Sequence, residues 1–290
     1  MSNEPKDYFY SSADALKLYC RIYPARQPGG TPVLCLPGLT RNSRDFVALA
    51  GHLQSRREVL TADLRGRGLS NRDRDPSHYQ LPNYVQDVWS LLDSRRLDRV
   101  VVIGTSLGGL IGMVMAAMKP ASIAGLVLND IGPELDPAGL RRIAGYAGKL
   151  PPVSSWDEAA AQTKSVYGLA LSDLTDAEWL DYARCAYREN ANGVPVPDVD
   201  PKISQAIKDG PAAAPDMWPL YAQITGVPML VIRGARSDIL AAATVVRMLR
   251  EKPDLMHIEV ANRGHTPLLN EPQCVTAIDS FLASHGRRDA

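Results

Sequence analysis

The chain has 290 residues, and its 32 basic residues balance its 32 acidic residues, so the formal net charge is zero. Nucleic-acid-binding proteins normally carry a basic excess, so this balance argues against a nucleic-acid partner. Apolar runs such as 100–103 and 229–232 are far shorter than the ~20 residues of a membrane helix. The polar start of the chain carries no secretory signal, so we expect a cytoplasmic protein without a membrane partner.

Cysteine and histidine are too scattered to form a recognisable metal site. The sequence has four cysteines and five histidines, without a CxxC pair or an HExxH motif. Cys20 and Cys35 lie in strand-like segments, where a buried free thiol is expected. We therefore predict no metal.

Short apolar runs alternate with helix-period stretches along most of the chain. Residues 17–23 alternate apolar and polar side chains, as a half-buried strand does. The short turn at 11–14 indicates an antiparallel hairpin at one edge, and the later alternation predicts a largely parallel sheet with helices on both faces. The expected strands are 17–23, 31–36, 58–64, 99–103, 123–129, 227–233 and 256–260, and the expected helices are 84–97, 107–118, 241–250 and 272–283.

Residues 134–220 break this alternation. They contain no convincing strand, and prolines separate short helical stretches around 156–166 and 176–187. Their 13 acidic and 8 basic residues give this segment a charge of −5, which leaves +5 on the remainder. We expect a helical cap or lid over a core domain formed by 1–133 and 221–290; the alternative is an ordinary helical layer.

A candidate nucleophile lies in the GxSxG segment Gly104-Thr-Ser-Leu-Gly108, between an expected strand and an expected helix. In this context the motif predicts a sharp turn that exposes the hydroxyl of Ser106. Glycine at 104 and 108 removes side chains that would clash across the turn. The helix N-terminus that follows favours developing negative charge.

A serine nucleophile needs a base, and that base needs an acid. His265 is the best candidate base because it lies in a loop directly after the last expected strand. Two aspartates that follow strands compete for the role of the acid. We favour Asp238, after the strand 227–233, over Asp130, after the strand 123–129, which we keep as the alternative.

The anionic intermediate of acyl transfer needs two hydrogen-bond donors. The backbone N–H of Leu107, next to the nucleophile, is one candidate donor. Leu39 is the other, in the loop Leu36-Pro-Gly-Leu-Thr40 that follows an expected strand. Gly38 permits the backbone turn that this loop requires.

The segment Asp63-Leu-Arg-Gly-Arg-Gly-Leu-Ser70 is basic and rich in glycine. Asn71 occupies the third position of a GxGxxG pattern, so the segment is not a dinucleotide-binding fingerprint. We interpret it as a structural loop near the site.

Together these segments resemble the α/β-hydrolase fold of serine hydrolases. The resemblance covers roughly residues 8–282 and includes the loops of Leu39, Asp238 and His265 and the GxSxG turn. It implies an eight-stranded, mostly parallel sheet flanked by helices, with a helical lid insertion. It also implies a catalytic triad of Ser106, Asp238 and His265 and no metal or organic cofactor.

Three departures from the family pattern refine this resemblance. Pro37-Gly38 stands where many relatives have His-Gly, which should be tolerated because the backbone donates to the oxyanion. The loop from Gly234 to Asp238 is one residue longer than the usual Gly-x-x-Asp, which keeps Asp130 as an alternative acid. Serine at 106, rather than aspartate, argues against the dehalogenase and epoxide hydrolase branches.

The leading prediction is hydrolysis of a carboxylic ester of a small or medium-sized molecule through an acyl-enzyme. The same residues could serve a carbon–carbon bond hydrolase of ring-fission diketones or an enol-lactone hydrolase. A hypothesis from another class is a ligand receptor of low turnover built on a hydrolase scaffold.

Overall fold

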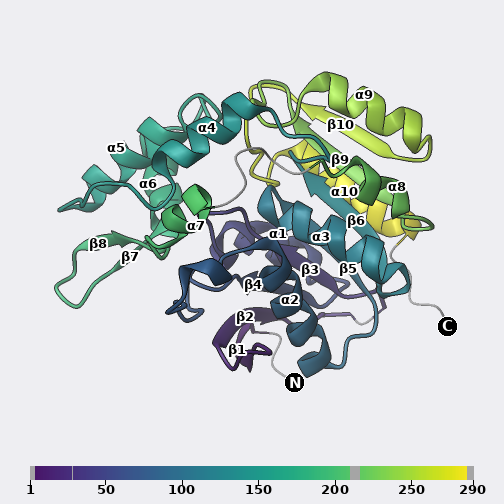
Figure 1. Ribbon diagram of the computed structural model, residues 1–290, viewed down its shortest axis with the longest axis horizontal. Coiled ribbons are helices and arrows are strands. Elements are labelled where there is room, and N and C mark those ends of the chain that lie inside the picture. Colours follow the sequence, from purple (N-terminus) through teal and green to yellow (C-terminus); the bar gives the residue numbers. More distant parts are fainter. Residues whose placement is uncertain (1–3, 28, 210–215, 286–290) are drawn as a thin grey trace.

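The computed structural model describes residues 4–27, 29–209 and 216–285, and Figure 1 shows a central sheet between two layers of helices. Every strand and helix expected for the core is present within three residues at each end. The strands are β1 Lys6–Ser11, β2 Lys17–Tyr23, β3 Val33–Leu36, β4 Val59–Asp63, β5 Val100–Thr105, β6 Ile123–Asn129, β7 Tyr187–Glu189, β8 Pro195–Pro197, β9 Met229–Gly234 and β10 Met256–Val260. The helices are α1 Val47–Leu53, α2 Leu81–Arg95, α3 Leu107–Met118, α4 Pro137–Tyr146, α5 Trp156–Tyr167, α6 Asp176–Ala186, α7 Ile203–Asp209, α8 Trp218–Gln223, α9 Ala242–Glu251 and α10 Pro272–His285.

The main sheet has eight strands in the order β1-β2-β4-β3-β5-β6-β9-β10. β2 pairs antiparallel with both β1 and β4, and the remaining pairs are parallel. The expected fold class is therefore confirmed: an α/β-hydrolase fold with a largely parallel eight-stranded sheet flanked by helices.

Strand periodicity divides the core into two layers. Leu34 and Leu36 of β3 belong to the cluster that contains α2, α3, α8 and α9. Val33 and Cys35 point the other way and pack with α1 and α10. Because successive side chains alternate across a strand, a strand covered on both faces must be apolar at every position. Both Cys20 and Cys35 are buried free thiols, as expected.

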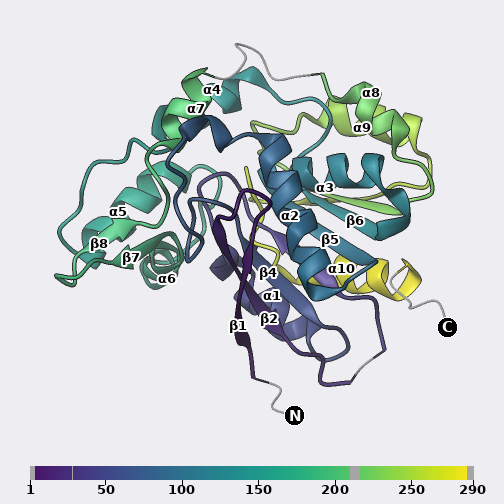
Figure 2. The same ribbon diagram turned by 60° about the horizontal axis from the view of Figure 1, so that its bottom comes forward.

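Helices α4–α7 and the strands β7 and β8 of the segment 134–220 lie to one side of the sheet in both views (Figures 1 and 2). The segment contains helices α4–α7, and also a short antiparallel pair, β7 and β8, that its sequence did not indicate. At three residues each, these strands are too short for a period of two to be visible. The boundary expected at residue 220 falls inside α8, which packs on α3 and so goes with the sheet.

Two helices of this segment begin at residues that satisfy their first free amides. The Ser155 side chain accepts a hydrogen bond from the Glu158 amide at the start of α5. Thr175 and Glu178 form a reciprocal capping box at the start of α6. Such caps typically contribute about 1 kcal/mol each, which helps short helices persist between prolines.

Specific hydrogen bonds attach the segment 134–220 to the core. The backbone of residues 198–200 pairs with the loop after β4: Gly68 N–H donates to Asp198 and Asp200 N–H donates to Gly66, at 3.1 and 2.7 Å. On the core, Arg44 Nη2 lies 2.6 Å from the Asp198 carboxylate. The loop that follows β4 is therefore in direct contact with this segment.

Within the described part of the chain, no helix combines the length and the apolar character that crossing a bilayer requires.

Candidate active site

Ser106 occupies the sharp turn between β5 and α3, with φ 51° and ψ −115°. A positive φ is rare for a residue with a side chain and marks a strained backbone. A Cβ on Gly104 would lie 2.4 Å from the carbonyl carbon of Gly108, and one on Gly108 would lie 2.1 Å from the Leu36 oxygen. The spacing of glycines in this motif therefore follows from the close approach of the helix start to two strands.

Three side chains form a continuous hydrogen-bonded chain in this turn and its neighbouring loops. Ser106 Oγ lies 2.8 Å from His265 Nε2. The other ring nitrogen, Nδ1, lies 2.8 Å from Asp130 Oδ2. His265 is 7% exposed and Asp130 is fully buried. The serine, the histidine and the carboxylate thus have the mutual geometry needed to move a proton from the serine hydroxyl to the imidazole.

The Asp130 carboxylate is held in place by further donors. The Gly234 amide donates to Oδ1 at 2.7 Å, and the Ser237 hydroxyl donates to Oδ2 at 2.6 Å. The Asp130 amide donates to the Ile232 carbonyl at 2.7 Å. Both carboxylate oxygens therefore have partners, which a buried charge requires.

Asp238, which we predicted as the partner of His265, does not hydrogen-bond to this histidine in the described structure. The Asp238 carboxylate instead accepts two hydrogen bonds from Arg142 of α4, at 2.5 and 2.8 Å. Burial alone would raise the pKa of Asp238, but the hydrogen bonds and charge of Arg142 lower it. The residue kept as the alternative, Asp130, is the one that contacts His265.

The two expected oxyanion donors flank Ser106. A Cβ built on Gly38 would lie 3.7 Å from Ser106 Cβ, so the loop that carries Leu39 lies against the serine. Leu107 is the first residue of α3. Neither the Leu39 nor the Leu107 amide donates a hydrogen bond to any of the residues that the structure describes. Both amides therefore remain available to an incoming oxygen.

A cavity of about 410 Å³ lies between the core and the segment 134–220. Its lining is mostly Val, Pro, Leu and Tyr side chains of that segment, and Thr40 and Arg72 are its core contributors. The Thr40 hydroxyl lies 3.1 Å from the Tyr167 hydroxyl. Because Thr40 directly follows Leu39, one end of the cavity lies beside the candidate oxyanion loop. Its volume suits a small molecule.

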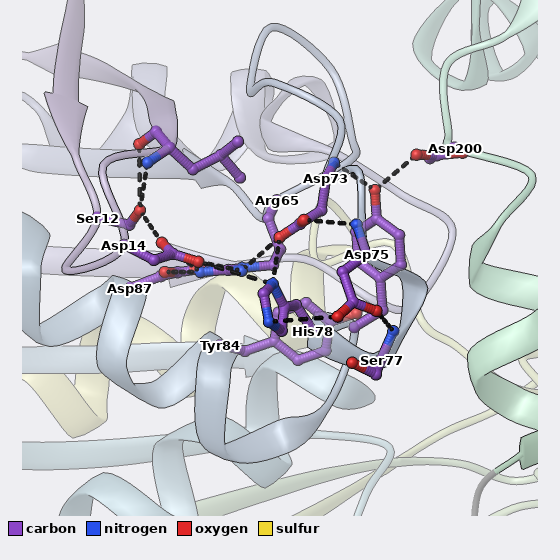
Figure 3. Close-up of polar contacts among 12 residues, drawn as sticks. Ser12, Asp14, Arg65, Asp73, Asp75, Ser77, His78, Tyr84, Asp87 and Asp200 are labelled. Atoms are coloured by element: carbon purple, nitrogen blue, oxygen red, sulfur yellow. Dashed lines mark hydrogen bonds and ion pairs between the residues drawn. The ribbon is translucent and has the colours of Figure 1, made fainter.

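One group of potential metal ligands occurs among the described residues: Asp14, Asp73 and His78. Figure 3 shows that the guanidinium of Arg65 lies among these side chains. Arg65 Nη1 donates to Asp14 at 3.0 Å and to Asp73 at 2.7 Å. The carboxylates are thus already paired with a cation, and we assign no metal to them.

Ser237 was missed by the sequence reasoning. Its hydroxyl bonds Asp130 and also caps the loop by accepting from the Leu240 amide at 3.0 Å. A lone serine in a polar loop gives no signal, since its partner comes from a different strand. The extra residue in the loop that ends at Asp238 was the one sign in the sequence that this loop has an unusual role.

Comparisons with known proteins identify the family. A family model described as "alpha/beta hydrolase fold" matches residues 31–272. A crystal structure of an α/β hydrolase from Novosphingobium aromaticivorans is 41% identical and superposes with a TM-score of 0.91, covering 98% of this chain and 99% of that chain.

Two relatives carry more specific names. The 3-hydroxybutyrate-oligomer hydrolase of Cupriavidus necator is 31% identical over 261 residues, which is 86% of this chain and 87% of the relative. The 2-(acetamidomethylene)succinate hydrolase of Mesorhizobium japonicum is 24% identical over 89% of this chain and 90% of its own length. The protein is a hydrolase, and the chain belongs to the α/β-hydrolase family.

Proposed function

We propose that this protein is a serine hydrolase that cleaves carboxylic esters through an acyl-enzyme, with Ser106, His265 and Asp130 as its triad. The observation that carries the proposal is the hydrogen-bonded chain from Ser106 Oγ through His265 to Asp130, with both links at 2.8 Å. A serine hydroxyl becomes a useful nucleophile when an oriented imidazole takes its proton.

The proposed reaction has two steps that use the same residues: acylation of Ser106 and hydrolysis of the acyl-enzyme. Ser106 Oγ attacks the acyl carbonyl while its proton passes to His265 Nε2, and Asp130 stabilises the imidazolium through Nδ1–H. The Leu39 and Leu107 amides donate to the oxyanion. His265 then protonates the leaving alcohol, and water releases the acyl group from Ser106 by the same steps.

The cavity next to Thr40 supports a small-molecule substrate, with the segment 134–220 acting as the cap that selects it. Most of the lining is apolar, which suits an acyl or alcohol chain of a few carbons. The relative from Cupriavidus necator is named a 3-hydroxybutyrate-oligomer hydrolase. We therefore propose short linear oligoesters of hydroxy acids as the first substrates to test.

The test is the Ser106→Ala variant with p-nitrophenyl butyrate and with dimers and trimers of 3-hydroxybutyrate. We expect turnover to be lost, because the remaining groups have no nucleophile to activate. Ser90, a half-buried serine of α2 whose hydroxyl donates to the Gln86 carbonyl, provides the matched control, and Ser90→Ala should behave as wild type. In the unmodified protein, a fluorophosphonate should label Ser106.

Other outcomes would redirect the proposal. Full esterase activity in pure Ser106→Ala protein would refute it. Turnover of a ring-fission diketone or an enol-lactone, but of no ester, would reassign the same residues to carbon–carbon or lactone hydrolysis. Tight ligand binding without turnover of any of these compounds would favour a receptor.

A further inference from the structure

Two arginines in the loop after β4 are almost completely buried. Arg65 is 2% exposed and Arg67 is 1% exposed. They are two residues apart, and both guanidinium groups lie inside the protein. Burying a cation costs several kcal/mol unless nearby groups compensate for its lost hydration, so the partners of each arginine are informative.

Carboxylates surround Arg65, as Figure 3 shows. Asp87 of α2 accepts hydrogen bonds from Nε and Nη2 at 2.7 and 2.6 Å. Asp73 and Asp14 accept from the other side of the guanidinium. Arg65 therefore joins the β1–β2 turn, the loop after β4 and α2, which is a structural role.

Arg67 has no such compensation. No carboxylate of the described residues forms an ion pair with it, and its partners are neutral: the carbonyl oxygens of Leu39 and Arg65 and the Tyr84 hydroxyl. The rings of Tyr79 and Tyr84 lie 5.6 and 4.9 Å from its guanidinium carbon. Within the described structure its Nη2 is buried without a hydrogen-bond partner. The positive charge of Arg67 thus faces neutral acceptors and aromatic rings, and no carboxylate of the described residues contacts it directly.

The position of this charge connects it to the candidate site. Arg67 Nε donates to the Leu39 carbonyl at 2.9 Å, so Arg67 holds the residue whose amide is a candidate oxyanion donor. The preceding residue, Gly38, lies against Ser106. The backbone of Arg67 also forms a β-bridge with Val199 of the segment 134–220. Arg67 is therefore fixed from the cap side as well.

We propose that Arg67 is a positioning residue of the oxyanion hole: it fixes the Leu39 carbonyl, one Cα away from the donor amide, and keeps a positive charge without a carboxylate partner behind the loop where negative charge develops. This inference rests on the proposed function. A fixed donor in a site with little water stabilises the transition state more than the neutral substrate. An unpaired buried cation is unfavourable for folding, so a functional reason for its presence is expected.

The test compares Arg67→Met with Arg65→Gln in the full-length protein, using p-nitrophenyl butyrate. Arg67→Met should lower kcat by about 10-fold to 100-fold with KM within about 3-fold, since misplacing one donor weakens only transition-state binding. Its Tm should be unchanged or higher, because an uncompensated charge has been removed. Arg65→Gln should lower Tm but leave kcat per fluorophosphonate-labelled site close to wild type.

A trifluoromethyl ketone inhibitor gives a second readout. It forms an anionic tetrahedral adduct with the serine, so Arg67→Met should weaken its binding by about the factor lost in kcat. Arg67→Lys, which keeps the charge but has fewer donors, should fall between wild type and Arg67→Met. If Arg67→Met does not fold, Arg67→Lys and Tyr84→Phe, which removes one of the two acceptors of Nη1, carry the same test.

The failures of the two proposals can be told apart. Wild-type kcat in Arg67→Met, together with loss of activity in Ser106→Ala, would overturn this inference and leave the proposed function intact. A lowered Tm with a raised KM and unchanged kcat would assign Arg67 a purely structural role. Activity in Ser106→Ala would instead refute the proposed function itself.

Discussion

Asp130 and Asp238 differ in their environments more than in their positions. Asp130 is fully buried and receives hydrogen bonds from Gly234, Ser237 and His265. Asp238 is partly exposed and engages Arg142 through both carboxylate oxygens. A carboxylate already bound to an arginine is a poor partner for an imidazole, because moving it would leave the arginine unpaired.

The first prediction at this scale concerns the acid of the triad. Asp130→Asn should lower kcat by about 10⁴, the scale seen when a triad carboxylate is replaced and the histidine tautomer is no longer fixed. Asp238→Asn is the matched control, and we expect its kcat to stay within about 10-fold of wild type, an effect below about 1.4 kcal/mol. Steady-state kinetics on p-nitrophenyl butyrate will measure both, and the reverse ranking would return the role to Asp238.

At the scale of elements, the turn between β5 and α3 is shaped by close packing, and it also carries the candidate nucleophile, Ser106. α3 begins so close to β3 and β5 that no side chain fits at Gly104 or Gly108. The positive φ of Ser106 follows from this close approach. The strain at the serine is therefore maintained by the packing of the helix against the sheet.

This packing predicts that adding one methyl group at residue 104 destabilises the protein. Gly104→Ala should lower the free energy of unfolding by about 3 kcal/mol or more and abolish activity, because its Cβ would overlap the backbone of Gly108 and Gly109. Gly51→Ala in α1 is the control: apart from its chain neighbours and the backbone of its own helix, no atom lies within 4 Å of its added Cβ.

That control should raise the free energy of unfolding by about 0.5–1 kcal/mol, because alanine favours the helix and restricts the unfolded chain. Urea titration of both variants will check the signs. Near wild-type stability in Gly104→Ala would show that the turn can open.

At the scale of the whole molecule, Asp63 makes stability depend on pH. It lies at the end of β4, and its carboxylate accepts hydrogen bonds from the Ser43 and Leu69 amides at 2.7 and 2.8 Å. Burial nevertheless raises the pKa of Asp63 to about 6. The folded protein thus holds a proton that the unfolded chain, with a pKa of about 3.9, releases.

The direction in which stability changes with pH follows from this difference between the folded and unfolded pKa of Asp63. The contribution of Asp63 to stability is complete below about pH 4 and is lost as the pH rises through about 6. Relative to Asp63→Asn, the wild type should gain about 2 kcal/mol in the free energy of unfolding between about pH 7.5 and about pH 4.5. Urea unfolding of the two proteins at both pH values measures this difference. A constant difference would mean that Asp63 titrates normally.

Local sequence was sufficient for much of the fold and for part of the site. Most core strands and the longer core helices could be predicted because their apolar patterns are local and both faces of the sheet are covered, whereas the short helices α1 and α8 were not expected. β7 and β8 could not, since three residues carry no visible period. The boundary expected at residue 220 falls inside α8, a short helix whose packing on α3 is visible only in the fold.

The sequence by itself determined the α/β-hydrolase fold, the turn that presents Ser106 and the loop that carries His265, because each depends on residues within one strand–turn–helix unit. Only the tertiary structure decided which carboxylate meets His265. Asp130 and Asp238 follow β6 and β9, which are adjacent strands, so both reach the same edge of the sheet. The choice depends on Arg142 from α4 and on Ser237 and Gly234. Likewise, only the fold brings the uncompensated Arg67 to the carbonyl of Leu39, because their contact joins two loops that are far apart in sequence.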